Sequence, residues 1–177
     1  MPDRYGRPPT SRTRTLILAA VLAAAVTLSL LVIFTRADPA PQVTFVSLKG
    51  EKITTAGLGG RVVLVNFWAT DCPVCVKEMP DMVRTYDRFH GRGLEFIAVA
   101  MRHDPPNYVI RYAEQNRLPF KVALDPAGEH ARAFGDVKLT PTTFVIDKHG
   151  NIVLKTTGAV DFEKLNALIE EKLKEPA

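Results

Sequence analysis

The chain has 177 residues, of which 46% are hydrophobic, and its 23 Lys and Arg against 19 Asp and Glu give a formal net charge of +4. From residue 39 onward, eighteen basic residues stand against seventeen acidic ones, so the excess positive charge lies in the first 36 residues. Because nucleic-acid binding needs basic residues gathered on one face, this balance argues against a nucleic-acid partner.

An uncharged apolar segment, residues 15–34, is the first strong feature along the chain. It is about long enough to cross a hydrocarbon core of roughly 30 Å as a helix, and four arginines precede it. The positive-inside rule then predicts a cytoplasmic basic tail over residues 1–14 and a transmembrane signal anchor over residues 15–35. We expect a single-pass protein of the cytoplasmic membrane, with the remainder of the chain on the extracytoplasmic, periplasmic side.

A cleaved signal peptide is the alternative for this segment, because small residues around position 36 would suit a signal peptidase. The apolar stretch is longer than is usual for such a peptide, and both alternatives predict the same compartment. Residues 36–42 contain Asp-Pro-Ala-Pro and are predicted to be a short stiff linker.

Residues 43–175 are long enough for one domain with its own core, and their pattern predicts strands that alternate with helices. Helices are expected after Cys72 and at the end of the domain, where apolar residues recur at helical spacing. Two further helices are predicted at 107–116 and 129–134. The predicted strands are residues 43–47, 52–54, 62–67, 94–101, 122–124, 143–146 and 152–156.

The two cysteines of the chain lie one helical turn apart, directly after the apolar run 62–67. Such a run is typical of a strand covered on both faces, and Pro73 suits the first turn of a following helix. Cys72 is then expected at a helix N-terminus, where exposed N–H groups and the helix dipole favour a thiolate. We predict that Cys72 attacks disulfides and that Cys75 resolves the mixed disulfide.

Three other interpretations of the cysteine pair are possible. A structural zinc site needs four ligands, but there is no second cysteine pair and the four histidines lack ligand-like spacing. A purely structural disulfide across so short a loop would remove little chain entropy. Two ordinary core cysteines are the third possibility. Redox exchange explains the motif better than any of these.

Three sequence segments together resemble the membrane-anchored thioredoxin-like proteins of the TlpA and ResA type. Residues 65–75 read Val-Asn-Phe-Trp-Ala-Thr-Asp-Cys-Pro-Val-Cys, residues 78–80 read Glu-Met-Pro, and residues 139–147 read Leu-Thr-Pro-Thr-Thr-Phe-Val-Ile-Asp. The cysteine motif alone is moderately specific, whereas the three segments with the strand and helix order are strongly so.

This resemblance implies a thioredoxin-like three-layer α/β/α fold with a central mixed sheet, preceded by one transmembrane helix. It also implies a protein-disulfide reductase whose only redox group is the disulfide between Cys72 and Cys75. The expected clients are apocytochrome c, at its haem-binding cysteines, or proteins that assemble copper sites. The expected electron donor is a membrane dithiol carrier of the DsbD or CcdA kind.

Pro141 matches the cis-proline of this family, and a cis peptide bond costs least before proline. Since proline has no N–H, the peptide group of Thr140 is left to pair with an extended substrate segment. Trp68 is expected beside the active-site loop as a third substrate contact. The alternatives are an ordinary trans-proline for Pro141 and a plain core position for Trp68.

Glu78 occupies a position where related reductases carry a glutamate near the dithiol. A carboxyl group there would exchange protons during thiol chemistry, and burial would raise its pKa. The alternative is a solvated carboxylate paired with Lys77 or Arg84. Asn66 stands where thioredoxin has a buried aspartate, so it is predicted either to tune the site or to be a polar residue hydrogen-bonded inside the sheet.

Asp71 departs from the family, which usually has tryptophan before the first cysteine. Its negative charge is expected to disfavour the Cys72 thiolate and to make the disulfide harder to reduce. Pro73 and Val74, which separate the cysteines, are predicted to tune the redox potential as well. His103 follows a predicted strand and is expected to be either a neighbour of the site or a solvated loop residue.

Other function classes stay open at this stage. A thiol peroxidase shares the predicted fold, but Thr70 lies two residues before Cys72 rather than three. A copper or redox assembly chaperone would use a wider cysteine pair with a well-placed histidine. A non-catalytic assembly factor would keep the fold without exchanging electrons.

Overall fold

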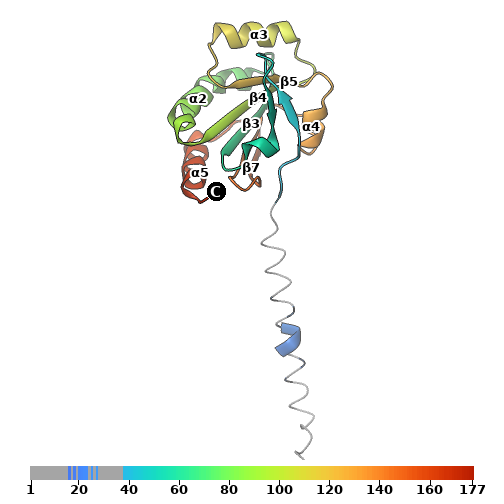
Figure 1. Cartoon of the computed structure of the whole chain (residues 1–177). Coiled ribbons are helices and arrows are strands. Elements are labelled where there is room, and N and C mark those ends of the chain that lie inside the picture. Colours follow the sequence, from blue (N-terminus) through green and yellow to red (C-terminus); the bar gives the residue numbers. More distant parts are fainter. Residues whose placement is uncertain (1–15, 17, 19, 24, 26, 28–37) are drawn as a thin grey trace, which may run out of the picture. The chain divides into compact units, whose positions relative to one another are not determined.

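The computed structural model describes residues 16, 18, 20–23, 25, 27 and 38–177 (Figure 1). The predicted basic tail, 1–14, and most of the predicted anchor, 15–35, therefore lie outside the described residues. Within the described part, the structure contains no helix long and apolar enough to cross a membrane.

A five-stranded sheet with the order β5-β4-β3-β6-β7 forms the centre of the domain. The central strand β3 runs parallel to β4, which is parallel to β5, whereas β6 is antiparallel to both β3 and β7. The sheet is therefore mixed, as predicted. Its strands are β3 (Val62–Trp68), β4 (Leu94–Ala100), β5 (Lys121–Leu124), β6 (Thr142–Ile146) and β7 (Ile152–Thr157).

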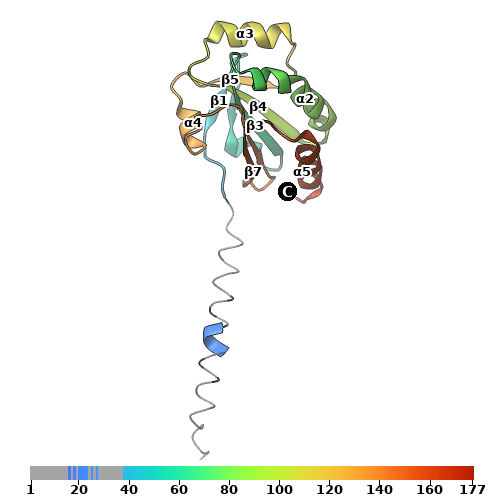
Figure 2. The ribbon, with the colours of Figure 1, turned by 180° about the vertical axis from the view of Figure 1, so that it is seen from behind.

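Every residue of β3 and β4 is buried, because both faces of the sheet are covered. One face packs against α2 (Pro73–Phe89), α3 (Pro106–Gln115) and α5 (Phe162–Lys174). The other face packs against the short helix α4 (Glu129–Ala133) and a small sheet near the start of the domain. Figure 1 and the reverse view in Figure 2 both place α2 and α5 on one side of the sheet and α4 on the other. Three layers result, as expected.

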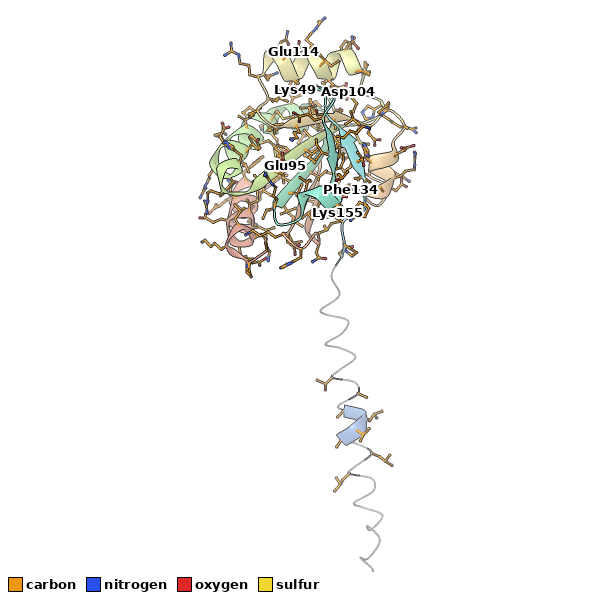
Figure 3. The ribbon with its side chains drawn as sticks, viewed as in Figure 1. Lys49, Glu95, Asp104, Glu114, Phe134 and Lys155 are labelled. Atoms are coloured by element: carbon orange, nitrogen blue, oxygen red, sulfur yellow. A yellow bond between two sulfur atoms is a disulfide. The ribbon has the colours of Figure 1, made fainter. Side chains whose placement is uncertain are left out.

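The short strands β1 (Thr44–Val46) and β2 (Lys52–Thr54) pair with each other in a separate two-stranded sheet. They do not extend the central sheet. Phe45 and Ile53 face the core instead, and Phe45 joins the aromatic cluster around Phe134, a residue labelled in Figure 3. Two 3₁₀ turns complete the structure, η1 (Thr55–Leu58) and η2 (His90–Arg92).

The start of the domain differs from the prediction of a linker over residues 36–42. Asp38 and Ala40 are hydrogen-bonded to the turn between β6 and β7, through Ile152 and Gly150. Ala40 is also buried. Residues 38–42 thus belong to the folded domain, because their backbone groups have partners far along the chain.

Candidate active site

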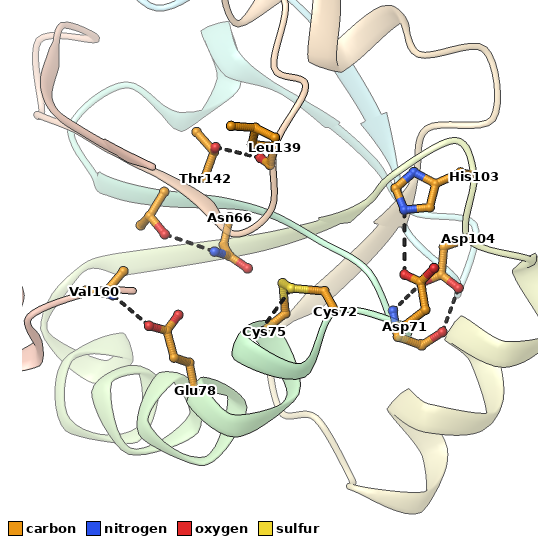
Figure 4. Close-up of a disulfide and its surroundings, with 12 residues drawn as sticks. Asn66, Asp71, Cys72, Cys75, Glu78, His103, Asp104, Leu139, Thr142 and Val160 are labelled. Carbon is orange, nitrogen blue, oxygen red and sulfur yellow. Dashed lines mark hydrogen bonds and ion pairs between the residues drawn. A yellow bond between two sulfur atoms is a disulfide. The ribbon is translucent and has the colours of Figure 1, made fainter. Parts of the chain in front are cut away.

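Strand β3 delivers the cysteine motif to the carboxyl-terminal edge of the sheet, where α2 begins. Cys72 is the N-cap residue of α2, Pro73 occupies the first turn, and the Sγ of Cys72 accepts a hydrogen bond from the backbone N–H of Cys75 at 3.2 Å. The two cysteines form a disulfide with their Cα atoms 5.3 Å apart (Figure 4). A sulfur thus takes the place of the oxygen that usually caps a helix.

The two sulfurs differ in exposure. Cys72 is half-buried, whereas Cys75 is only 3% exposed and packs in the core. The N-terminus of a helix stabilises a negative charge through its free N–H groups and its dipole. The accessible sulfur is therefore also the one at the position that favours a thiolate in the reduced protein.

The peptide bond between Thr140 and Pro141 is cis, as expected from the family. Pro141 is buried, and Thr140 is half-buried. Among the described residues, neither the N–H nor the C=O of Thr140 has a hydrogen-bond partner. The hydroxyl of Thr142 donates a hydrogen bond to the carbonyl of the exposed Leu139 at 2.7 Å (Figure 4). This bond links the two ends of the segment 139–142 that contains the cis bond.

Glu78 is buried one helical turn beyond Cys75, with 8% of its surface exposed. One carboxylate oxygen accepts a hydrogen bond from the backbone N–H of Val160 at 2.6 Å, and the other has no partner in the described part of the chain (Figure 4). Burial raises the pKa of Glu78, the hydrogen bond from Val160 opposes this increase, and Asp81 adds to it. The alternative of a solvated carboxylate paired with Lys77 or Arg84 is wrong, since Arg84 pairs with Asp81.

Two residues of β3 lie in the interior. Asn66 is buried and donates from Nδ2 to the hydroxyl of Thr143 at 2.9 Å, which confirms the hydrogen-bonded polar residue inside the sheet. Trp68 is fully buried, with its ring centroid 5.2 Å from that of Tyr112. The prediction that Trp68 contacts the substrate is therefore corrected, because a residue without exposed surface packs in the core.

Asp71 and His103 are brought together at the edge of the site. The Oδ1 of Asp71 lies 3.6 Å from the Nε2 of His103, and their side chains are 72% and 51% exposed. Figure 4 shows the carboxylate of Asp71 directed toward this ring. The two residues between the cysteines, Pro73 and Val74, are exposed. They offer surface beside the half-buried sulfur of Cys72.

Asp104 is a residue of the site that the sequence did not predict. This buried carboxylate follows β4 and accepts two hydrogen bonds from Thr70, one from its N–H and one from its hydroxyl, both at 2.6 Å. Asp104 thereby holds the segment that leads into Cys72. An aspartate a few residues after a buried strand, followed by two prolines, was the available signal.

The chemistry available at this site is that of sulfur, a buried carboxyl group and an open peptide group. No group of three or more His, Cys, Asp or Glu side chains in the described part of the chain is arranged to hold a metal ion. The half-buried Cys72 and the buried Cys75 are placed for exchange with an external disulfide, which needs one accessible sulfur and one that attacks afterwards.

Comparisons with known proteins agree with this site. The Redoxin family model matches residues 35–169. The chain is 35% identical over 136 residues to "Thiol-disulfide oxidoreductase ResA" of Bacillus thuringiensis subsp. konkukian, covering 76% of this chain and 75% of that protein. It is also 35% identical over 123 residues to ResA of Halalkalibacterium halodurans, covering 70% and 69% of the two chains.

Solved structures give the same result for the fold. A thiol:disulfide interchange protein of Chlorobium tepidum superposes with a TM-score of 0.72 at 30% identity, covering 78% of this chain and 98% of that one. StoA of Bacillus subtilis superposes with a TM-score of 0.63 at 25% identity, covering 75% and 98%. The thioredoxin-like fold that was expected is confirmed.

Proposed function

This chain belongs to the Redoxin family, among the TlpA/ResA-type thioredoxin-like thiol-disulfide oxidoreductases, and we propose that it reduces disulfides of client proteins outside the cytoplasm. The observation that carries the proposal is the difference between its sulfurs. Cys72 is half-buried at the start of α2 and Cys75 is buried in the core. This difference supports a first attack by Cys72 and a second by Cys75.

The reaction transfers two electrons to the client. In the reduced protein, the Cys72 thiolate attacks one sulfur of the client disulfide, so that the client bond breaks and the first client thiolate leaves and takes up a proton. The Cys75 thiolate then attacks the Sγ of Cys72, breaks the mixed disulfide and releases the second client thiolate. The protein is left with the Cys72–Cys75 disulfide, which an external dithiol must reduce.

Glu78 is the proposed proton acceptor for Cys75. The two residues are neighbours on α2 and both are buried. Burial raises the pKa of Glu78 and so brings its proton affinity closer to that of a thiol. A carboxyl group of this kind is suited to take the proton from Cys75 before the second attack.

The open peptide group of Thr140 is the proposed docking point for the client backbone. Its N–H and C=O lack partners in the described part of the protein, next to the cis bond to Pro141. An extended client segment would satisfy both groups in the manner of an added strand. This arrangement recognises backbone rather than side chains.

The resemblance supports two client classes, apocytochrome c and proteins that assemble copper sites. The same resemblance supports a membrane dithiol carrier of the DsbD or CcdA kind as electron donor. The apolar segment 15–34 and the arginines before it support a location on the outer side of the cytoplasmic membrane.

Trapping tests the proposed roles. A full-length Cys75→Ser variant stops after the first attack and is expected to accumulate mixed disulfides through Cys72 in cells. The Cys72→Ser variant is the matched control and is expected to trap none. Captured clients identified by mass spectrometry would name the substrate class. Equal trapping by both variants would refute the assignment of roles.

Cell fractionation tests the proposed location. The full-length chain is expected in the membrane fraction, with its domain digested by protease added from outside. A soluble product that begins near Asp38 would show cleavage instead of anchoring. Domains that resist external protease in intact spheroplasts would contradict an extracytoplasmic location.

A further inference from the structure

A cavity of about 400 Å³ lies between the loop that follows β4 on one side and, on the other, α4 with the segment that joins it to β6. Four basic residues line it, Arg102 and His103 from the first wall and Arg132 and Lys138 from the second. Asp136 is its one acidic lining residue. The mechanism described above uses none of these five side chains.

Two of the four basic side chains that line this cavity lack an acidic partner among the described residues. In the described part of the chain, neither Arg102 nor Arg132 forms an ion pair with a carboxylate. Arg132 donates only to the backbone carbonyl of Ala127, at 2.9 Å. Asp136 is already paired with Lys138, its Oδ2 lying 3.0 Å from Nζ.

The two arginine side chains converge over Gly128. A Cβ atom at this glycine would lie 3.3 Å from the Cδ of Arg102 and 3.3 Å from the Nη1 of Arg132. Both arginine side chains thus pack beside Gly128, where no side chain separates them from the backbone. Both side chains carry a positive charge that no carboxylate of the described chain neutralises, and an anion bound in the cavity would supply that partner.

Each wall of the cavity leads to the active site. His103 contacts Asp71, the residue before Cys72 (Figure 4). Lys138 is followed in the chain by the exposed Leu139, and then by the open peptide group of Thr140. The cavity is therefore bordered by residues that lie near the two groups, Cys72 and Thr140, at which the proposed reaction would hold a client.

We propose that this cavity binds carboxylates of an acidic client segment that lies beside the disulfide being reduced. This inference rests on the proposed reductase function and adds a preference among its clients. Arginine is well suited to carboxylates, because its planar guanidinium group donates two parallel hydrogen bonds. A concave site lined by one sign of charge also raises the rate at which oppositely charged partners meet it.

Two synthetic peptides test the proposal on the reduced full-length protein. Both contain one intramolecular disulfide, flanked by glutamates in the first peptide and by glutamines of nearly equal size in the second. The readout is the ratio of kcat/KM for the two peptides at low and high salt. We expect the acidic peptide to be preferred roughly two- to fivefold for each charge pair formed, with the ratio falling toward one as salt screens the charges.

Variants that each remove one positive charge show which residues cause the preference for the acidic peptide. Arg102→Gln is expected to lower the preference for the acidic peptide, and Lys138→Gln to lower it as well. Arg111→Gln removes the same charge from the exposed surface of α3 and is the matched control, expected to keep the full preference. A preference retained in Arg102→Gln and Lys138→Gln would place the acidic segment elsewhere and overturn the proposal.

The same measurements separate this inference from the function on which it rests. Equal rates for the two peptides would refute acidic client binding while leaving the reductase function intact. Failure to reduce either peptide, or insulin, would refute the reductase function itself. A preference for the glutamine peptide would likewise overturn the proposed cavity role.

Discussion

Replacing Glu78 by glutamine isolates the effect of a buried charge next to the dithiol. The glutamine side chain keeps nearly the same volume and retains an oxygen that accepts the hydrogen bond from the backbone N–H of Val160, which Glu78 accepts at 2.6 Å. Only the ability to ionise is lost. Any change in pH dependence then reports on the carboxyl group and not on the packing of α2.

The expected direction follows from proton binding in the two states. Glu78 ionises near its ordinary pKa of 4.5 in the unfolded chain, whereas burial raises the pKa in the folded protein. Between these two values the folded protein holds a proton that the unfolded chain has released. The free energy of unfolding therefore falls as pH rises through this window, by about 1.4 kcal/mol for each unit of difference between the two pKa values.

Urea unfolding of oxidised protein comprising residues 38–177, measured between pH 4 and pH 8, provides the assay. We expect the Glu78→Gln variant to gain stability relative to the native protein as pH rises, and the gain to level off above the folded pKa. Glu114→Gln, on the exposed surface of α3, is the control and is expected to show no such gain.

A second variant fixes the contribution of the hydrogen bond. Glu78→Ala removes the acceptor for Val160 and is expected to be about 1–3 kcal/mol less stable than Glu78→Gln at every pH, because the N–H loses its partner and neither variant can ionise at this position. A stability difference between native protein and Glu78→Gln that stays constant from pH 4 to pH 8 would refute a raised pKa for Glu78.

Further predictions concern the cysteines and the segment before them. Under limiting alkylating agent the reduced domain is expected to label at Cys72 before Cys75, and the opposite order in peptide mapping would reverse their roles. Asp104→Ala is expected to lower the free energy of unfolding by about 1.5–3 kcal/mol in urea, because a charged acceptor is lost, while the exposed Asp87→Ala stays near the native value. Asp71→Asn is expected to raise the reduction potential in glutathione buffers, since it removes a negative charge beside the thiolate; an unchanged potential would show that this charge is fully screened.

Features encoded by neighbouring residues could be predicted from the sequence. The continuous apolar runs of β3 and β4 indicated strands buried on both faces, and the structure confirms this. The N-terminal position of Cys72 followed from the proline after it, because helix capping is decided within one turn. The burial of Glu78 and the cis bond before Pro141 were expected from the family resemblance.

Contacts between distant segments were decided only by the tertiary structure. Asp104 is 34 residues from Thr70, and the two meet because β4 lies parallel to β3 and both strands end at the same edge of the sheet. The walls of the charged cavity likewise come from the loop before β5 and from α4 and the segment after it. Periodicity and capping act over a few residues, whereas strand order and packing set which loops share an edge. For this reason the sequence alone indicated the reacting sulfurs, and only the fold revealed what surrounds them.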